Sequence, residues 1–350
     1  MNMILGACMT ETDDSDRLIQ EVLSELGWND DPKKVADKVR RLDQGLPAED
    51  EFTAICSWLG KARLVHKLDQ HQAPTNSRDL YQVPDLLVEF EHSGPVLIEV
   101  KSKAKPTLSF APHYLDKLNA YAQLVGMPLL IAWKHHGLWV LFEIQHLAKA
   151  QRNFNISLGN AMKENLLGVL AGDVAYKIAS GAGVRISCKK EQLIDTEEDG
   201  GTATEQWQMR IDEVGFMITG GKMVDELDPD VTTLFTTWDL SERQTHSDTH
   251  IDLRFVADND DGMMFGHMAL THLLHWTLPQ GEAINWRHAI RRDSVVSNMT
   301  NFQRALERAL EQKVVHIILH QQPHTWPHFI PCVTRLYSTQ QKVVAYICLI

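Results

Sequence analysis

Three charged residues lie where the sequence predicts an apolar pair of strands. Residues 84–91 and 95–102 have the β-branched and aliphatic residues of buried strands and are joined by a short turn. Asp85 begins the first strand, and Glu99 and Lys101 lie inside the second. Charges in such surroundings cost free energy unless they are compensated. Their types and spacing therefore indicate a site with a chemical purpose.

The spacing predicts how the three side chains meet. Glu99 and Lys101 project from the same face of a strand, about 6–7 Å apart at roughly 3.3 Å rise per residue, while Val100 points into the core. A hairpin would bring Asp85 beside Glu99, and two adjacent carboxylates repel each other unless a cation lies between them. Mg²⁺ fits, because it commonly binds through one or two carboxylates, waters and a substrate phosphate. A lysine there can hold a phosphate oxygen.

Pro84-Asp85 followed by Glu99-Val100-Lys101 resembles the motif of the PD-(D/E)xK nuclease superfamily, which includes many restriction endonucleases and the archaeal Holliday-junction resolvases. The resemblance covers about residues 46–145, which is under a third of the chain. It implies a nuclease that uses Mg²⁺, with Mn²⁺ as a substitute. It also implies that Asp85 and Glu99 are metal ligands and that Lys101 is the catalytic lysine.

The same resemblance suggests further site residues. An acid on the preceding helix often completes such a site, and Glu51 is the first choice for this third metal ligand, with Glu49 second. Lysines alternate along the end of the second strand, which is the pattern of an anion-facing strand end. The expected nucleic-acid contacts are Lys103, Lys105, Lys117, Lys134, Tyr121 and Gln123.

The elements around the motif predict an α/β (α+β) fold. Residues 46–150 read as helix, strand, strand, strand, helix, strand, strand, which predicts a restriction-endonuclease-like mixed sheet flanked by helices. This core is preceded by a helical segment over residues 1–45 and extends to residue 150 or to about 190. A second α/β module, over residues 151–350, is expected to regulate the first or to recognise a substrate or partner.

Beyond residue 150 the patterns are weaker, and no internal repeat is evident. Turn residues such as Gly and Asp separate the strand-like pieces. The predicted elements are helices over 155–172, 262–277 and 300–312, and strands within 183–190, 195–261, 314–320 and 342–350.

Charge is distributed unevenly. The chain carries a net charge of −12. Residues 45–150 contain 10 Lys and Arg against 11 Asp and Glu, a net charge of −1, whereas residues 195–261 contain 4 against 18, a net charge of −14. A nucleic-acid binder must neutralise phosphates, so the first half is the part that can meet a polyanion. The acidic tract is expected to restrain the nuclease or to bind a basic partner, and a homodimer through residues 151–350 is a further possibility.

Cysteine and histidine spacing points to no second site. Five scattered cysteines without CxxC spacing favour a reducing cytoplasm, and no apolar run reaches the length of a membrane span. Some histidines recur every four residues, but the prolines among them interrupt a helix and argue against zinc binding. The residues with this spacing are His316, His320, His324, His328 and Cys332. Zinc binding by His246 and His250, which are also four residues apart, is discounted in the same way.

The leading hypothesis is a Mg²⁺-dependent DNA endonuclease that uses Asp85, Glu99 and Lys101. A bacterial defence or restriction nuclease is one context that suits it, and RNA stays open as a substrate. One alternative is a surface hairpin whose charges are merely solvated. Another is a non-catalytic, nuclease-like scaffold that binds nucleic acid or a protein partner.

Overall fold

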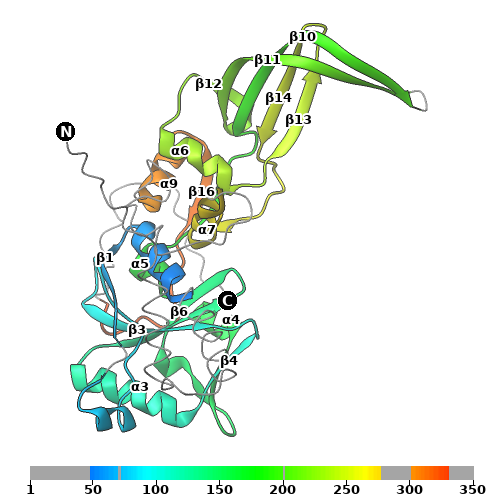
Figure 1. Ribbon diagram of the computed structural model, residues 1–350. Coiled ribbons are helices and arrows are strands. Elements are labelled where there is room, and N and C mark those ends of the chain that lie inside the picture. The colour runs from blue at the N-terminus through cyan, green and yellow to red at the C-terminus, as the bar shows by residue number, and fades with distance from the viewer. Residues whose placement is uncertain (1–47, 70–71, 200–201, 277–300, 331–350) are drawn as a thin grey trace, which may run out of the picture.

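The structure is a computed structural model that describes residues 48–69, 72–199, 202–276 and 301–330 (Figure 1). The helical segment predicted over residues 1–45 and the strand predicted over 342–350 lie outside these residues. The described part has mixed α/β architecture, with two five-stranded and two three-stranded sheets flanked by helices. The predicted fold class is therefore confirmed. None of the described helices is long and apolar enough to cross a membrane.

The sheet that carries the motif has the strand order β1-β2-β3-β5-β6. The β3–β5 pair is parallel and the other pairs are antiparallel, so the sheet is mixed as predicted. In the predicted hairpin, Leu86 pairs with Ile98 and Val88 with Val96. The five strands are β1 (Ala62–Lys67), β2 (Leu86–Phe90), β3 (Pro95–Ser102), β5 (Leu129–His135) and β6 (Leu138–Glu143).

Helices cover both faces of this sheet (Figure 1). The helix over residues 48–59 packs on the face that carries Val100, whereas α3 (Pro112–Val125) packs on the opposite face, against Leu97. Alternation along β3 explains the division, because successive side chains of a strand point to opposite faces. The helix α3 ends at Gly126, whose φ of 70° lies in the left-handed region.

A small sheet and two short helices follow the motif. The prediction of one helix over residues 155–172 is wrong, because the chain forms a strand there and then two separate helices. Asn165 lies between these helices, and its side chain accepts hydrogen bonds from the backbone N–H groups of Leu141 and Leu167. The sheet has the order β4-β8-β7. The elements are β4 (Thr107–Phe110), β7 (Ala148–Lys149), β8 (Phe154–Ser157), α4 (Leu158–Lys163) and α5 (Leu167–Ala171), with the 3₁₀ helices η1 (Thr75–Asp79) and η2 (Ile144–His146).

The second half of the chain shares the hydrophobic core of the first. One cluster of buried side chains runs from Phe52 and Trp139 to Phe302 and Val315. The core is thus continuous across residue 150, and the domain boundary there stays a prediction. The elements of this part are β9 (Ala175–Ile178), β15 (Met264–Phe265), β16 (Val315–Leu319), α6 (Pro229–Thr233), α7 (Gly266–Trp276) and α9 (Phe302–Glu311), with the 3₁₀ helices η3 (Thr219–Gly221) and η4 (Leu234–Thr237).

An outlying sheet holds most of the acidic tract. Its order is β12-β11-β10-β14-β13, and β10 and β11 extend beyond the other strands as a two-stranded arm (Figure 1). Gly183 fits where β10 meets β14, because a Cβ there would lie 1.8 Å from the carbonyl oxygen of Phe255. The strands are β10 (Gly183–Asp199), β11 (Thr202–Ile218), β12 (Lys222–Val224), β13 (Ser241–His246) and β14 (His250–Val256).

Candidate active site

The hairpin brings Asp85, Glu99 and Lys101 together at one end of the first sheet. Asp85 immediately precedes β2, and its Oδ2 accepts a hydrogen bond of 2.7 Å from the backbone N–H of Val100. Glu99 and Lys101 share a face of β3, and the Lys101 ammonium donates to Glu99 Oε1. Val100 points the other way into the core. The geometry is the one that the alternation along the strand predicts.

Glu99 is the most deeply buried member of this group, since only 1% of its surface is exposed. Its Oε1 accepts hydrogen bonds from Lys101 and from the hydroxyl of Tyr114. Its Oε2 is buried and has no hydrogen-bond partner among the described residues. Such an atom is costly in a folded protein, so it calls for an explanation.

The electrostatics follow from burial and proximity. Burial raises the pKa of Asp85 well above its usual range, and the nearby Glu99 carboxylate raises it further. Burial alone would lower the pKa of Lys101, but the adjacent Glu99 carboxylate outweighs this effect and raises that pKa above its ordinary value. Lys101 is therefore a fixed cation, and the acidic members of the group crowd one another.

Tyr114 belongs to the site, although the sequence argument did not select it. The Tyr114 hydroxyl donates a hydrogen bond to Glu99 Oε1 and lies 3.4 Å from Lys101 Nζ. The same Nζ lies 5.3 Å from the centroid of the Tyr114 ring. Burial and the Glu99 carboxylate both raise the pKa of this phenol. Helical spacing was an available signal, because Tyr114 lies four residues before the buried Leu118 on α3.

The two acids proposed for the preceding helix have different surroundings. Glu51, the first choice, lies on the Val100 face of the sheet, where it accepts hydrogen bonds from the Lys134 ammonium and from Trp139 Nε1 at 3.0 Å. Glu49, the second choice, lies within electrostatic reach of Glu99. Burial raises the pKa of Glu49, and the negative charge of Glu99 raises it further.

A lysine on β1 already binds the acids at the start of this helix. Lys67 Nζ lies 3.0 Å from the Glu49 carboxylate and 2.6 Å from that of Asp50. This ion pair lowers the pKa of Glu49, against the larger effect of burial. The structure therefore brings Glu49, and not Glu51, towards Asp85 and Glu99.

The predicted nucleic-acid contacts are dispersed around the site. Lys103 and Lys105 follow β3 on an exposed loop, and Gln123 is exposed on α3. Lys117 donates a 2.8 Å hydrogen bond to the carbonyl oxygen of Arg78. Lys134 faces Glu51 on the side of the sheet opposite to Glu99 and Lys101. Tyr121, which is half-buried, packs beside Leu97 and Leu118.

The donor set fits a hard divalent cation. Within the described ranges, no group of three or more His, Cys, Asp or Glu side chains is close enough to hold a metal ion alone. Mg²⁺, however, commonly uses only one or two carboxylates and completes its shell with waters and phosphate oxygens. Glu99 Oε2 is a buried oxygen without a partner beside a second carboxylate. These residues therefore fit such an ion.

The comparison with family models agrees with the motif. Residues 72–171 match the family model described as archaeal Holliday junction resolvase (Hjc), a range that includes Asp85, Glu99 and Lys101. A similar solved structure is that of Hjc, a Holliday junction resolvase from Archaeoglobus fulgidus, an archaeal hyperthermophile. It is 19% identical, covers 28% of this chain and 76% of its own chain, and has a TM-score of 0.24. No curated protein matches the chain. The resemblance to the PD-(D/E)xK nuclease superfamily is thus confirmed over residues 72–171.

Proposed function

We propose that this protein is a metal-dependent phosphodiesterase that cleaves DNA, with its catalytic centre at Asp85, Glu99 and Lys101. The observation that carries the proposal is the buried, unpartnered Oε2 of Glu99, adjacent to Asp85 and to the Lys101 ammonium. The family model that matches these residues describes junction resolvases, so branched DNA is the substrate class that we favour. DNA is preferred over RNA on the same ground.

Asp85 and Glu99 would hold the cation, and Glu49, which lies within electrostatic reach of both, would add negative charge around it. Mg²⁺ is the expected ion and Mn²⁺ its substitute. When bound, it supplies positive charge that stabilises the negative charge developing on the phosphate. Glu51, bonded to Lys134 and Trp139, would instead stabilise the helix against the sheet.

Lys101 would contact the phosphate itself. It stays charged because Glu99 raises its pKa, and its side chain is 27% exposed, so its ammonium can reach a bound anion. Tyr114 would keep Glu99 and Lys101 in place, since its hydroxyl contacts both side chains. A preorganised cation beside the reacting phosphate needs no rearrangement as charge develops.

The charges of the described residues around this site suit a polyanion. Lys103 and Lys105 are exposed directly after β3 and would contact neighbouring phosphates. The acidic arm of β10 and β11 lies at the end of the molecule remote from α3 (Figure 1). We propose that the part beyond residue 171 selects substrates or partners. The defence context stays a prediction from the sequence.

A cleavage panel tests this function. The wild-type protein would be incubated with a four-way DNA junction, a linear duplex, single-stranded DNA and RNA, each with Mg²⁺, Mn²⁺ or EDTA. We expect cleavage of junction DNA with either metal ion, none in EDTA, and a loss of at least about 100-fold in Asp85→Ala and Lys101→Ala. Metal-independent cleavage, or cleavage that both variants retain, would contradict the proposal. Salt-sensitive DNA binding without any cleavage would instead favour a non-catalytic scaffold.

A further inference from the structure

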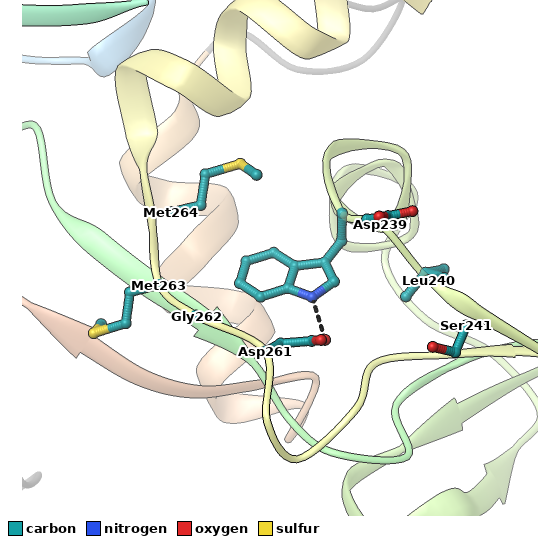
Figure 2. Close-up of a pocket in the computed structure, with 8 residues that line it drawn as sticks. Asp239, Leu240, Ser241, Asp261, Gly262, Met263 and Met264 are labelled. Carbon is teal, nitrogen blue, oxygen red and sulfur yellow. Dashed lines mark hydrogen bonds between the residues drawn. The ribbon is translucent and has the colours of Figure 1, made fainter.

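A shallow hollow lies at the base of the outlying sheet, between the loop that joins η4 to β13 and the loop that joins β14 to β15 (Figure 2). Its volume is about 370 Å³. Its lining residues fall between Trp238 and Met264, so it shares no residue with the site at Asp85 and Glu99. It therefore has a chemistry of its own.

An indole ring forms the fixed part of this hollow. Trp238 Nε1 donates a 2.8 Å hydrogen bond to Asp261 Oδ2, and that oxygen also accepts 2.9 Å from the backbone N–H of Asp258. The ring centroid lies 5.6 Å from that of Tyr176. Figure 2 shows the hydrogen bond to Asp261 as a dashed line. The polar edge of the indole is satisfied, and part of the ring packs against the main core and Tyr176, so only the half-buried part that lines the hollow can meet a ligand.

Flexible apolar side chains complete the lining. Met263 is 42% exposed, and Met264 and Leu240 are half-buried. Thioether side chains adapt to different shapes and are common on surfaces that bind partners. Beside the indole, they offer contact to an alkyl chain.

The charge around the hollow is negative. Asp239 is exposed at its rim and Asp261 lies against the indole (Figure 2). Two basic side chains near these loops are already engaged, since Arg243 pairs with Asp258 and Lys177 donates to the carbonyl oxygen of Asn259. Both loops lie in the stretch with a net charge of −14, or directly after it. An occupant with positive charge is complementary to this surface.

We propose that the hollow binds a lysine or arginine side chain from a basic segment of a protein partner. The alkyl stem would lie along Met263, and the cationic head would lie over the Trp238 ring, near the Asp239 carboxylate. A cation over an indole face is favourable, and long basic side chains bury their stems while their heads stay charged. Nucleic acid has the wrong sign of charge for this surface. The inference does not rest on the proposed nuclease activity.

Binding of a fluorescently labelled peptide of alternating lysine and alanine, followed by anisotropy with the full chain, tests the proposal. Asp239→Lys should weaken binding by about tenfold, because it places a like charge beside the bound cation. The matched variant Asp248→Lys makes the same charge change at an exposed position in the turn between β13 and β14. It should weaken binding by less than about twofold, because screened charges at a distance contribute little.

Two further measurements separate a built site from general attraction. Acetylation of the lysines should abolish binding, since it removes the cation. Met263→Ser, at an exposed position that leaves the fold intact, should weaken binding by about threefold through loss of stem contact. Equal losses in Asp239→Lys and Asp248→Lys, undiminished binding of the acetylated peptide, or no binding by the wild type would overturn the proposal.

Discussion

At the scale of single residues, the candidate site is a crowded group of ionisable side chains around Glu99. Its two oxygens differ, since one accepts from Lys101 and Tyr114 while the other is buried without a partner among the described residues. Asp85 is held next to it by the N–H of Val100. The free protein stores an unfavourable arrangement of charge that a bound cation would relieve. Such conflicts between stability and function are typical of active sites.

Asp85 should make the metal-free protein less stable as the pH rises. Its pKa is raised in the folded protein above the usual value of 3.8, so above that value the folded state holds more protons than the unfolded state. Stability is therefore lost as the pH rises from about 4 through the raised pKa. Asp85→Asn cannot ionise and keeps an oxygen for the Val100 N–H. We expect it to unfold at a higher temperature than the wild type at pH 8 in EDTA, with the difference shrinking towards pH 4. Parallel curves over this range would refute the assignment.

Tyr114→Phe should impair cleavage without unfolding the protein. It removes the O–H that donates to Glu99 and lies near Lys101, so Glu99 loses a group that orients it. Loss of a partner that orients a metal ligand costs about 10–100-fold in metal affinity or activity. Cleavage rates across a Mn²⁺ titration should show a higher half-saturating concentration. Tyr81→Phe, in the loop before β2, is the control and should resemble the wild type. Equal effects of both substitutions would argue against a positioning role for Tyr114.

At the scale of elements, the edge strand β6 is capped by the second half of the chain. The backbone N–H of Trp139 donates a 3.2 Å hydrogen bond to His267 Nε2, and the backbone N–H of Leu141 donates one of 3.0 Å to the Asn165 side chain. The imidazole Nδ1 of His267 in turn lies 2.7 Å from the Asp173 carboxylate. Edge strands are prone to unwanted pairing, and these side chains cover this one.

His267→Ala should destabilise the protein strongly. Only 1% of His267 and 3% of Asp173 is exposed. The substitution therefore leaves Asp173 Oδ2 and the backbone N–H of Trp139 without the imidazole partner that each has, while Asp173 Oδ1 keeps its hydrogen bond from the backbone N–H of residue 267. We expect the free energy of unfolding in urea to fall by about 2–4 kcal/mol. His272→Ala, on the same helix, is the control, since its Nδ1 makes a 3.3 Å contact with the Thr237 carbonyl oxygen. A change under about 1 kcal/mol in His267→Ala would show that the cap contributes little.

The arm of β10 and β11 should be dispensable for folding and cleavage. Lys190 pairs with Met209 across the arm, and residues 191–196 are exposed. Replacing residues 191–208 by Asn-Gly would close the two strands with a tight hairpin turn. We expect the free energy of unfolding to change by less than about 1 kcal/mol and the cleavage rate to stay at the wild-type level. A loss of cleavage with the fold intact would place the arm in substrate binding.

How much of this could be read from the sequence depends on whether the deciding contacts are local. The hairpin and α3 follow from alternation and helical periodicity, and Glu99 and Lys101 share a face for the same reason. The side of the sheet that Glu51 faces depends on how the helix over 48–59 packs, which no local pattern contains. The break in the helix predicted over 155–172 depends on Asn165, whose side chain bonds to Leu141 and to Gln321, far away in the sequence.

At the scale of the whole molecule, the nuclease-like sheet and the later elements stabilise one another. Leu59, on the helix over residues 48–59, and Phe302, on α9, belong to one buried cluster and lie close to Gly266. The family model ends at residue 171, whereas the core continues beyond it. The resolvase-like part carries the candidate chemistry, and the remainder completes its core and presents the acidic sheet.

A fragment that ends at residue 150 should therefore fold poorly. It would expose the side of Trp139 and Phe52 that the second half covers, and it would lack the cap on β6. We expect the full chain to unfold in urea in one cooperative transition, and the fragment to show none and to aggregate. Cooperative unfolding of the fragment would instead support an independent domain ending near residue 150.

The central claim is that Asp85 and Glu99 hold a metal ion beside Lys101 to cleave DNA. The most direct measurement is the single-turnover rate of four-way-junction cleavage in Mg²⁺ by the wild type and by Asp85→Asn, whose thermal stability in EDTA shows that it is folded. We expect the wild type to cleave and the variant to be slower by at least about 100-fold while still binding the junction. Cleavage by Asp85→Asn at the wild-type rate would contradict the claim.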